Sequence, residues 1–124
     1  MTTMDAQERQ DLERYGSWER MTGGEWFLPS MPEAKKEHQR TFRLVKQLNE
    51  LHNTDQERAE GILHEILPED SAVPGLHVPL NLEYGCNLVC GERVFINFGA
   101  TILAQAQVML GDGVMVGPNC SLIT

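Results

Sequence analysis

The sequence predicts an α+β protein in which a helical N-terminal cap precedes a parallel β-helix that is incomplete at its C-terminal end. Three observations predict this fold. The charges divide unevenly, since residues 1–70 hold 24 of the 28 charged side chains. Apolar residues repeat at helical spacing in this first part and every six residues in the second. We therefore divide the chain into a helical domain, residues 1–70, and a β-helix domain, residues 71–124.

Three helices are expected in the first part. The first spans residues 5–21 and ends at a glycine pair. The second begins at an apparent capping box over residues 30–33, with proline in its first turn, and runs to about His52. The third begins at another capping box, residues 54–57, and ends before Pro68. Because short amphipathic helices bury little surface alone, we expect these helices to pack on the second part.

Two apolar columns with a six-residue period run through the second part. The main column is interrupted once, by a two-residue insertion within residues 104–107, and a second column lies two residues before each of its members. The members of the main column are Cys90, Ile96, Ile102, Leu110, Val116 and Leu122. This period matches the rung of a parallel β-helix, in which one fixed position points inward and must be apolar. A β-sandwich is the alternative, but its strands would alternate with a period of two and irregular spacing.

Composition excludes several classes of protein. A net charge of −8 and a pI of about 4.9 argue against nucleic-acid binding, which needs a basic face for phosphates. No apolar stretch approaches the roughly 20 residues of a membrane span, and the N-terminus lacks the apolar segment of a secretory signal. Three cysteines form no disulfide framework, so we expect free thiols in a cytoplasmic protein. Cys86 and Cys90 lack the further ligands of a metal site, so no metal is expected.

Three segments resemble the maltose and galactoside O-acetyltransferases. They are MTGGEWFLPSMPE at residues 21–33, LEYGCNLVCGERVFINFGATIL at residues 82–103 and GDGVMVGPNCSLIT at residues 111–124. The resemblance implies a left-handed β-helix and a homotrimer with active sites between neighbouring β-helices. It also implies transfer of an acetyl group from acetyl-CoA to a sugar hydroxyl, with a histidine as general base on that hydroxyl.

The histidines of this chain do not match the catalytic position of that family. The family histidine lies a few residues beyond the segment equivalent to 121–124. We expect His38, His52 and His64 to be solvated on charged helices and His77 to lie in a linker. The apolar column also still runs at Thr124. The sequence therefore predicts an N-terminal fragment of a longer acetyltransferase, inactive by itself. A naturally truncated relative and a non-catalytic trimeric module are the alternatives.

The resemblance places three residues near the acceptor sugar: Glu83, Asn97 and Gln105. Asn97 matches a family asparagine that contacts the acceptor, and a turn residue is the alternative. Glu83 stands where the family has a short polar or acidic residue, and a solvated edge charge is the alternative. Leu28 and Gln105 replace common family acids, although Gln105 can still hydrogen-bond a hydroxyl. The acceptor therefore need not be maltose or a galactoside: a nodulation-type oligosaccharide, an amino sugar and another small alcohol remain open. Tyr84 is expected to cap the first rung, and a wall of the cleft is the alternative.

Overall fold

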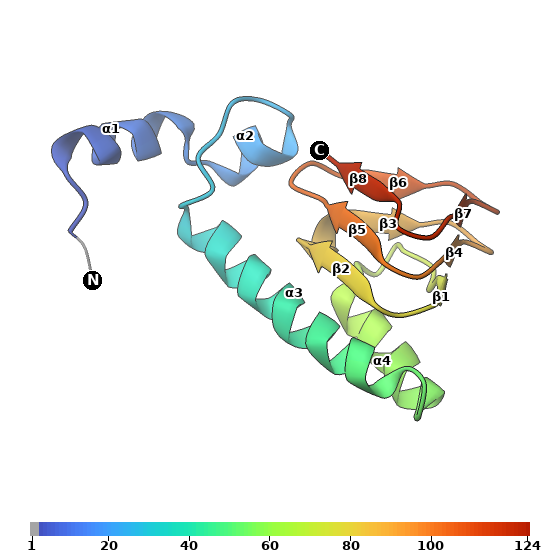
Figure 1. Ribbon diagram of the computed structural model, residues 1–124. Helices are drawn as coiled ribbons and strands as arrows, with labels where there is room; N and C mark the ends of the chain where they lie inside the picture. The colour runs from blue at the N-terminus through green and yellow to red at the C-terminus, as the bar shows by residue number, and fades with distance from the viewer. Residues whose placement is uncertain (1–2) are drawn as a thin grey trace.

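The computed structural model describes residues 3–124 and shows a helical part joined to a coil of parallel strands (Figure 1). The helices are α1 (Ala6–Tyr15), α2 (Trp18–Thr22), α3 (Pro32–Leu51) and α4 (Gln56–Ile66). The strands are β1 (Gly75–Leu76), β2 (Leu80–Glu83), β3 (Leu88–Cys90), β4 (Phe95–Ile96), β5 (Ala100–Leu103), β6 (Val108–Leu110), β7 (Met115–Val116) and β8 (Ser121–Ile123). A short 3-10 helix, Gly85–Asn87, lies between β2 and β3. The predicted α+β class is confirmed.

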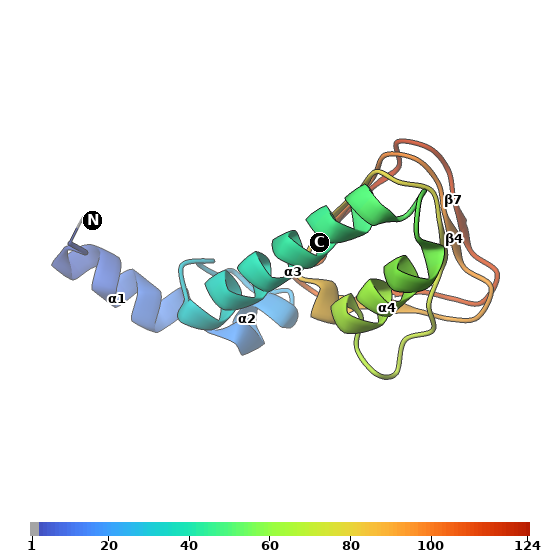
Figure 2. The same ribbon diagram turned by 90° about the horizontal axis from the view of Figure 1, so that it is seen from below.

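The single helix predicted over residues 5–21 is wrong, because the chain forms α1 and α2 there. Gly16 leaves the helical conformation, with φ −94° and ψ 53°. The Ser17 hydroxyl then accepts a hydrogen bond from the Arg20 N–H and begins a new helix. None of the residues of α1 is buried, and Figures 1 and 2 show this helix extending away from the strands.

The other two helices lie where the sequence predicts them, but their first turns differ. The capping box predicted over residues 30–33 is wrong: Met31 is the N-cap of α3 and makes no side-chain capping bond. Pro32 starts the helix instead, because its fixed φ suits the first helical position. The capping box predicted over residues 54–57 is also wrong: Asp55 and not Thr54 caps α4, since its carboxylate accepts the Arg58 N–H at 3.1 Å.

The strands form three parallel sheets, in the orders β1–β4–β7, β2–β5–β8 and β3–β6. Each strand pairs with the strand one coil later: Leu76 pairs with Ile96, and Ile96 with Val116. This topology confirms the parallel β-helix and excludes the sandwich, whose strands would pair antiparallel. The coil begins at β1, earlier than the first rung counted from the sequence. The insertion predicted within residues 104–107 has a counterpart at residues 84–87, which form the same corner of the preceding coil.

One apolar core joins the helices to the coil. Leu48 of α3 and Ile66 of α4 are fully buried together with Ile96 and Ile102 of the predicted inward column. In Figure 2 the successive turns of the coil overlap one another, and α3 and α4 lie across them. The helices therefore pack on the coil, as expected, and they cover its N-terminal end.

Polar side chains of α3 satisfy the backbone groups at this end of the coil. The Asn49 amide donates to the Leu80 carbonyl and accepts from the Leu80 N–H, both at 3.0 Å. The Thr41 hydroxyl accepts the Gly85 N–H at 2.9 Å. Because β2 has β5 on one side only, its outer edge would otherwise be open to pairing with another chain.

A half-buried ion pair on α3, Glu37 with Arg40, contacts the end of α4. Arg40 donates to the Glu37 carboxylate at 2.7 and 2.8 Å and to the carbonyls of Glu65 and Ile66. Burial raises the pKa of Glu37, but the hydrogen bond and charge of Arg40 and the Cys86 N–H outweigh it, so the pKa lies below its ordinary value. The charged form is thus favoured by folding. Its contribution to stability is present above the ordinary carboxylate pKa and is lost as the pH falls through the folded value.

We expect Asn49→Ala to lower the free energy of unfolding by about 2 kcal/mol, because it leaves the Leu80 N–H and carbonyl without their side-chain partner. Urea denaturation measures this change. Asn53→Ala is the matched control, since Asn53 is exposed beyond the end of α3. Equal and small effects of the two substitutions would show that the Asn49 contacts do not support the coil.

Candidate functional site

Glu83, at the end of β2, is the centre of a cluster of side chains from three separate segments. Its Oε1 lies 3.2 Å from Nε2 of His38 on α3. Its Oε2 accepts a hydrogen bond from the Gln105 amide, 3.4 Å away, in the turn after β5. The Glu83 and His38 side chains are 25% and 32% exposed, so both reach solvent. We refer to His38, Glu83 and Gln105 as the Glu83 cluster.

His38 is less solvated than the sequence predicts, since about two thirds of its side chain is covered. Its ring packs on Phe42, with centroids 4.2 Å apart, and on Tyr84 at 5.8 Å. The reason is the course of α3, which lies along β2. His38 continues the buried stripe of Thr41 and Val45 by one turn toward the N-terminus. The helical spacing of His38 from Thr41 and Val45 could have indicated its partial burial. Its charged neighbours in the sequence favoured an exposed position instead.

The structure brings together two of the three predicted site residues, Glu83 and Gln105. Glu83 lies on an edge strand and is partly exposed, but each of its carboxylate oxygens has a side-chain partner. The second polar atom of Gln105, Oε1, is buried and has no hydrogen-bond partner among the described residues. The cluster therefore places a partly exposed carboxylate at the rim of the coil, with an amide beside it whose nitrogen donates to that carboxylate.

Asn97 lies elsewhere in the coil. It precedes β5 whereas Gln105 follows it, and a four-residue strand spans roughly 13 Å. The Asn97 Oδ1 accepts the Phe98 N–H at 2.8 Å and lies 3.2 Å from Nδ1 of His77. These are the contacts of a turn residue. The prediction that His77 lies in a linker is wrong, because it follows β1 inside the first coil and stacks on Phe98 at 4.3 Å.

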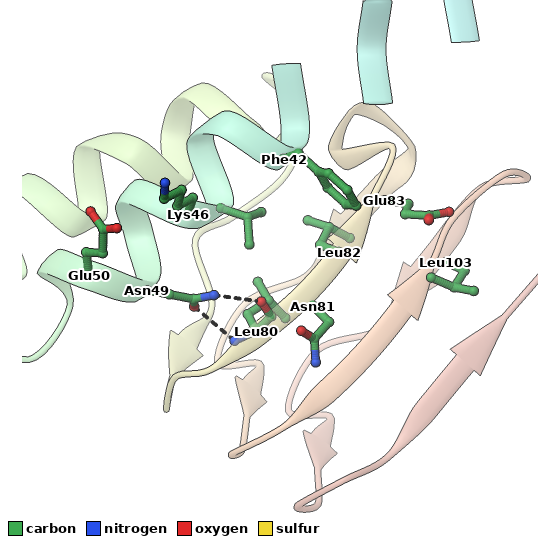
Figure 3. A pocket seen from close by; sticks show the side chains of 10 residues that line it. Phe42, Lys46, Asn49, Glu50, Leu80, Asn81, Leu82, Glu83 and Leu103 are labelled. Atoms are coloured by element: carbon green, nitrogen blue, oxygen red, sulfur yellow. Dashed lines mark hydrogen bonds between the residues drawn. The ribbon is translucent and has the colours of Figure 1, made fainter. Parts of the chain in front are cut away.

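A groove of about 500 Å³ runs between α3 and β2 beside the Glu83 cluster (Figure 3). Its walls combine apolar and polar side chains from the helix and from the coil. They are Phe42, Val45, Lys46, Asn49 and Glu50 on α3, and Leu80, Asn81, Leu82, Glu83 and Leu103 on the coil. Figure 3 shows Glu83 at the end of the groove that Phe42 and Leu103 share, with Lys46 and Glu50 toward the other end.

The side chains of Leu28 and Tyr84 pack among residues of the N-terminal helical segment, although Tyr84 itself follows β2. Leu28 lines a separate pocket of about 470 Å³ with Tyr15, Arg20, Trp26 and other residues of the N-terminal segment. Tyr84 is 4% exposed and packs edge-on against Trp18, with ring centroids 6.2 Å apart. Burial, and then the Glu83 charge, raise the pKa of Tyr84, so it stays a neutral phenol. Tyr84 thus caps the first coil, as expected, and anchors α2 to it.

The three cysteines are free thiols. Burial, followed by the charge and hydrogen bond of Glu37, raises the pKa of Cys86 to about 12, which makes it a poor nucleophile. Over residues 3–124, no group of three or more histidine, cysteine, aspartate or glutamate side chains is placed to hold a metal ion. In the same range, every helix is too short or too polar to cross a membrane.

Comparison with known proteins points to one family. The family model described as the maltose acetyltransferase hexapeptide capping motif matches residues 20–70. Nodulation protein L of Rhizobium leguminosarum bv. viciae is 32% identical over 106 residues, which are 86% of this chain and 56% of that protein. The chain thus spans about half the length of the curated relatives it matches.

Solved structures agree with the sequence comparison. A maltose O-acetyltransferase from Clostridium difficile 630 superposes with a TM-score of 0.80 at 24% identity, over 86% of this chain and 57% of that one. A hexapeptide-repeat acetyltransferase from Vibrio cholerae O1 biovar eltor, complexed with acetyl-CoA, has a TM-score of 0.70 at 25% identity. That match covers 85% of this chain and 57% of the other.

The raised pKa of Cys86 predicts slow alkylation of its thiol. In a Cys90→Ala, Cys120→Ala background, the rate with iodoacetamide at pH 8 should be roughly 10³-fold below that of an unstructured cysteine peptide. It should rise about tenfold per pH unit between pH 7 and 9, because only the thiolate reacts. Glu37→Gln, which removes the neighbouring charge, should speed the reaction. A rate equal to that of the peptide would contradict the assigned environment.

Proposed function

Because the chain belongs to the maltose and galactoside O-acetyltransferase family, we propose that it carries the acceptor side of an acetyl-CoA-dependent O-acetyltransferase acting on a sugar hydroxyl. The matched segments make up only about half of these relatives, so the activity of the whole protein is part of the proposal. Acetyl-CoA supplies the acetyl group as a thioester. The residues that we assign in this chain contact the acceptor sugar, and none of them is assigned to acetyl-CoA.

The Glu83 cluster is the observation that carries this proposal. A carboxylate accepts hydrogen bonds from hydroxyls, and an amide both donates to them and accepts from them. Glu83 and Gln105 present these groups together, from consecutive coils, beside an open groove. His38 contacts the other carboxylate oxygen, which limits the number of positions that the Glu83 side chain adopts. Fixed hydrogen-bonding groups of this kind orient a hydroxyl for reaction.

The reaction requires a proton acceptor as well as an oriented hydroxyl. The hydroxyl oxygen bonds to the thioester carbonyl carbon, the carbon–sulfur bond breaks, and the hydroxyl proton passes through a base to the departing thiol. The family resemblance gives this role to a histidine beyond the segment equivalent to 121–124. The histidines of this chain have other surroundings: His38 faces Glu83, and His77 stacks on Phe98. We therefore propose that none of them is the base.

Asn97 enters the same proposal through a second copy of the chain. The length of β5 keeps Asn97 apart from the Glu83 cluster within one copy, so both can contact the same sugar ring only if they come from neighbouring copies. This arrangement agrees with the homotrimer that the family resemblance implies, in which active sites lie between β-helices. A closed ring of three copies would contain three equivalent sites.

We expect residues 1–124 alone to release no CoA from acetyl-CoA in the presence of sugars, and the longest natural form to do so. The reason is the lack of a positioned base, which typically contributes about 10²–10⁴ in rate. A thiol-reactive dye measures CoA release across a panel of glucosides, galactosides and amino sugars. Sugar-dependent release by residues 1–124 would show that a histidine of this chain is the base. Inactivity of a well-folded longer form would favour a non-catalytic trimeric module.

The shared site predicts a specific pattern of complementation. Chains carrying Glu83→Ala and chains carrying Asn97→Ala should each bind acceptor weakly. After joint unfolding and refolding of equal amounts, about a quarter of the sites should regain both wild-type residues if copies assemble at random in rings. Sedimentation should give a trimer of the 14.0 kDa chain. A monomer, or no recovery of acceptor binding in the mixture, would exclude the shared site.

A further inference from the structure

The groove between α3 and β2 is larger than a single hydroxyl-binding cluster requires. It starts at Glu83 and continues along the helix past Lys46 to Glu50 (Figure 3). The Glu83 cluster occupies only one end of it. We propose that the groove is an extended acceptor subsite, which holds a second sugar ring of an oligosaccharide acceptor. This inference rests on the proposed function, because it assumes that Glu83 faces the acceptor.

Phe42 is the first argument for this subsite. Its ring is 53% exposed although it borders a buried core, and it lies one helical turn after His38. Contact with His38 holds it beside the Glu83 end of the groove. An exposed aromatic ring that is fixed in position offers a flat apolar surface at low entropic cost. The apolar face of a sugar ring fits such a surface.

The rim of the groove supplies the second argument. Polar groups of both kinds surround it: the Lys46 ammonium donates hydrogen bonds, the Glu50 carboxylate accepts them, and the Asn81 amide does both. The floor beneath them is apolar, made by Val45, Leu80 and Leu82. A sugar ring matches this distribution, because it carries hydroxyls around its edge and C–H groups on its faces. A plain hydrocarbon chain would leave the polar rim without partners.

Continuity with the Glu83 cluster gives the third argument. Glu83 lines the groove and also contacts His38 and Gln105, so one side chain belongs to both places. An acceptor whose reacting ring is held at Glu83 can therefore extend its next ring directly onto Phe42. The subsite would select acceptors of two or more rings over single sugars.

Binding of sugars of different length tests the inference. Calorimetric titration of residues 1–124 uses three series of probes, built from glucose, galactose and glucosamine, each as a methyl monosaccharide and as a linked trisaccharide. We expect the trisaccharide of the preferred series to bind at least tenfold more tightly than its monosaccharide. In Phe42→Ala this ratio should fall to about one, whereas Phe42→Tyr should preserve it. Met109→Ala, which removes another exposed apolar side chain, on β6 and away from the groove, should leave the ratio as in the wild type.

Other results would refute the subsite, the role of Phe42 or the acceptor side. Equal affinity of monosaccharide and trisaccharide in the wild type would refute the subsite and leave the proposed function intact. An unchanged ratio in Phe42→Ala would refute the role of the ring. A change of oligomeric state in Phe42→Ala, seen by sedimentation, would assign the groove to a second copy instead. Failure of every sugar to bind would refute the acceptor side itself, and the subsite with it.

Discussion

The structure depends on the way in which α3 closes the first coil of the β-helix. A coil of parallel strands leaves a row of backbone N–H and C=O groups free at its end, and these groups need partners. Asn49 and Thr41 provide them from the helix, and Leu48 fills the space beneath. The helix must therefore lie along β2 in one register. The contact of α3 with Glu83 follows from that register.

The Glu83 cluster is a consequence of this closure. His38 is 45 residues away from Glu83 in the sequence, and it reaches the carboxylate because α3 follows the edge strand. Gln105 reaches it from the other side for a different reason. Glu83 pairs with Leu103 in the parallel register, so the corner that follows β5 lies directly beside the corner that follows β2. One contact thus derives from the cap and the other from the period of the coil.

The sequence could predict the coil but only part of the cluster. The six-residue period is visible because each rung needs one apolar residue inward, and the burial of Ile96 and Ile102 confirms that assignment. The first coil was missed because its corner holds a 3-10 helix and Tyr84 in a left-handed conformation, with φ 56°, which conceal the repeat. His38 was missed because its partners come from distant segments. A periodic pattern in the sequence cannot reveal the contact between His38 and Glu83, which are 45 residues apart.

The distribution of acidic groups links the structure to the choice of acceptor. Leu28 and Gln105 stand where the family that this sequence resembles commonly has acidic residues. Their presence suggests weaker binding of the acceptor sugar. The geometry modifies that view. Gln105 donates to Glu83 at 3.4 Å, so the cluster keeps one carboxylate, supplied by β2 rather than by the turn after β5. Leu28 lines a different pocket and does not enter the cluster. Under the proposed function, an acceptor hydroxyl would meet a carboxylate that is held by an imidazole and an amide, which would restrict the angle from which the hydroxyl approaches.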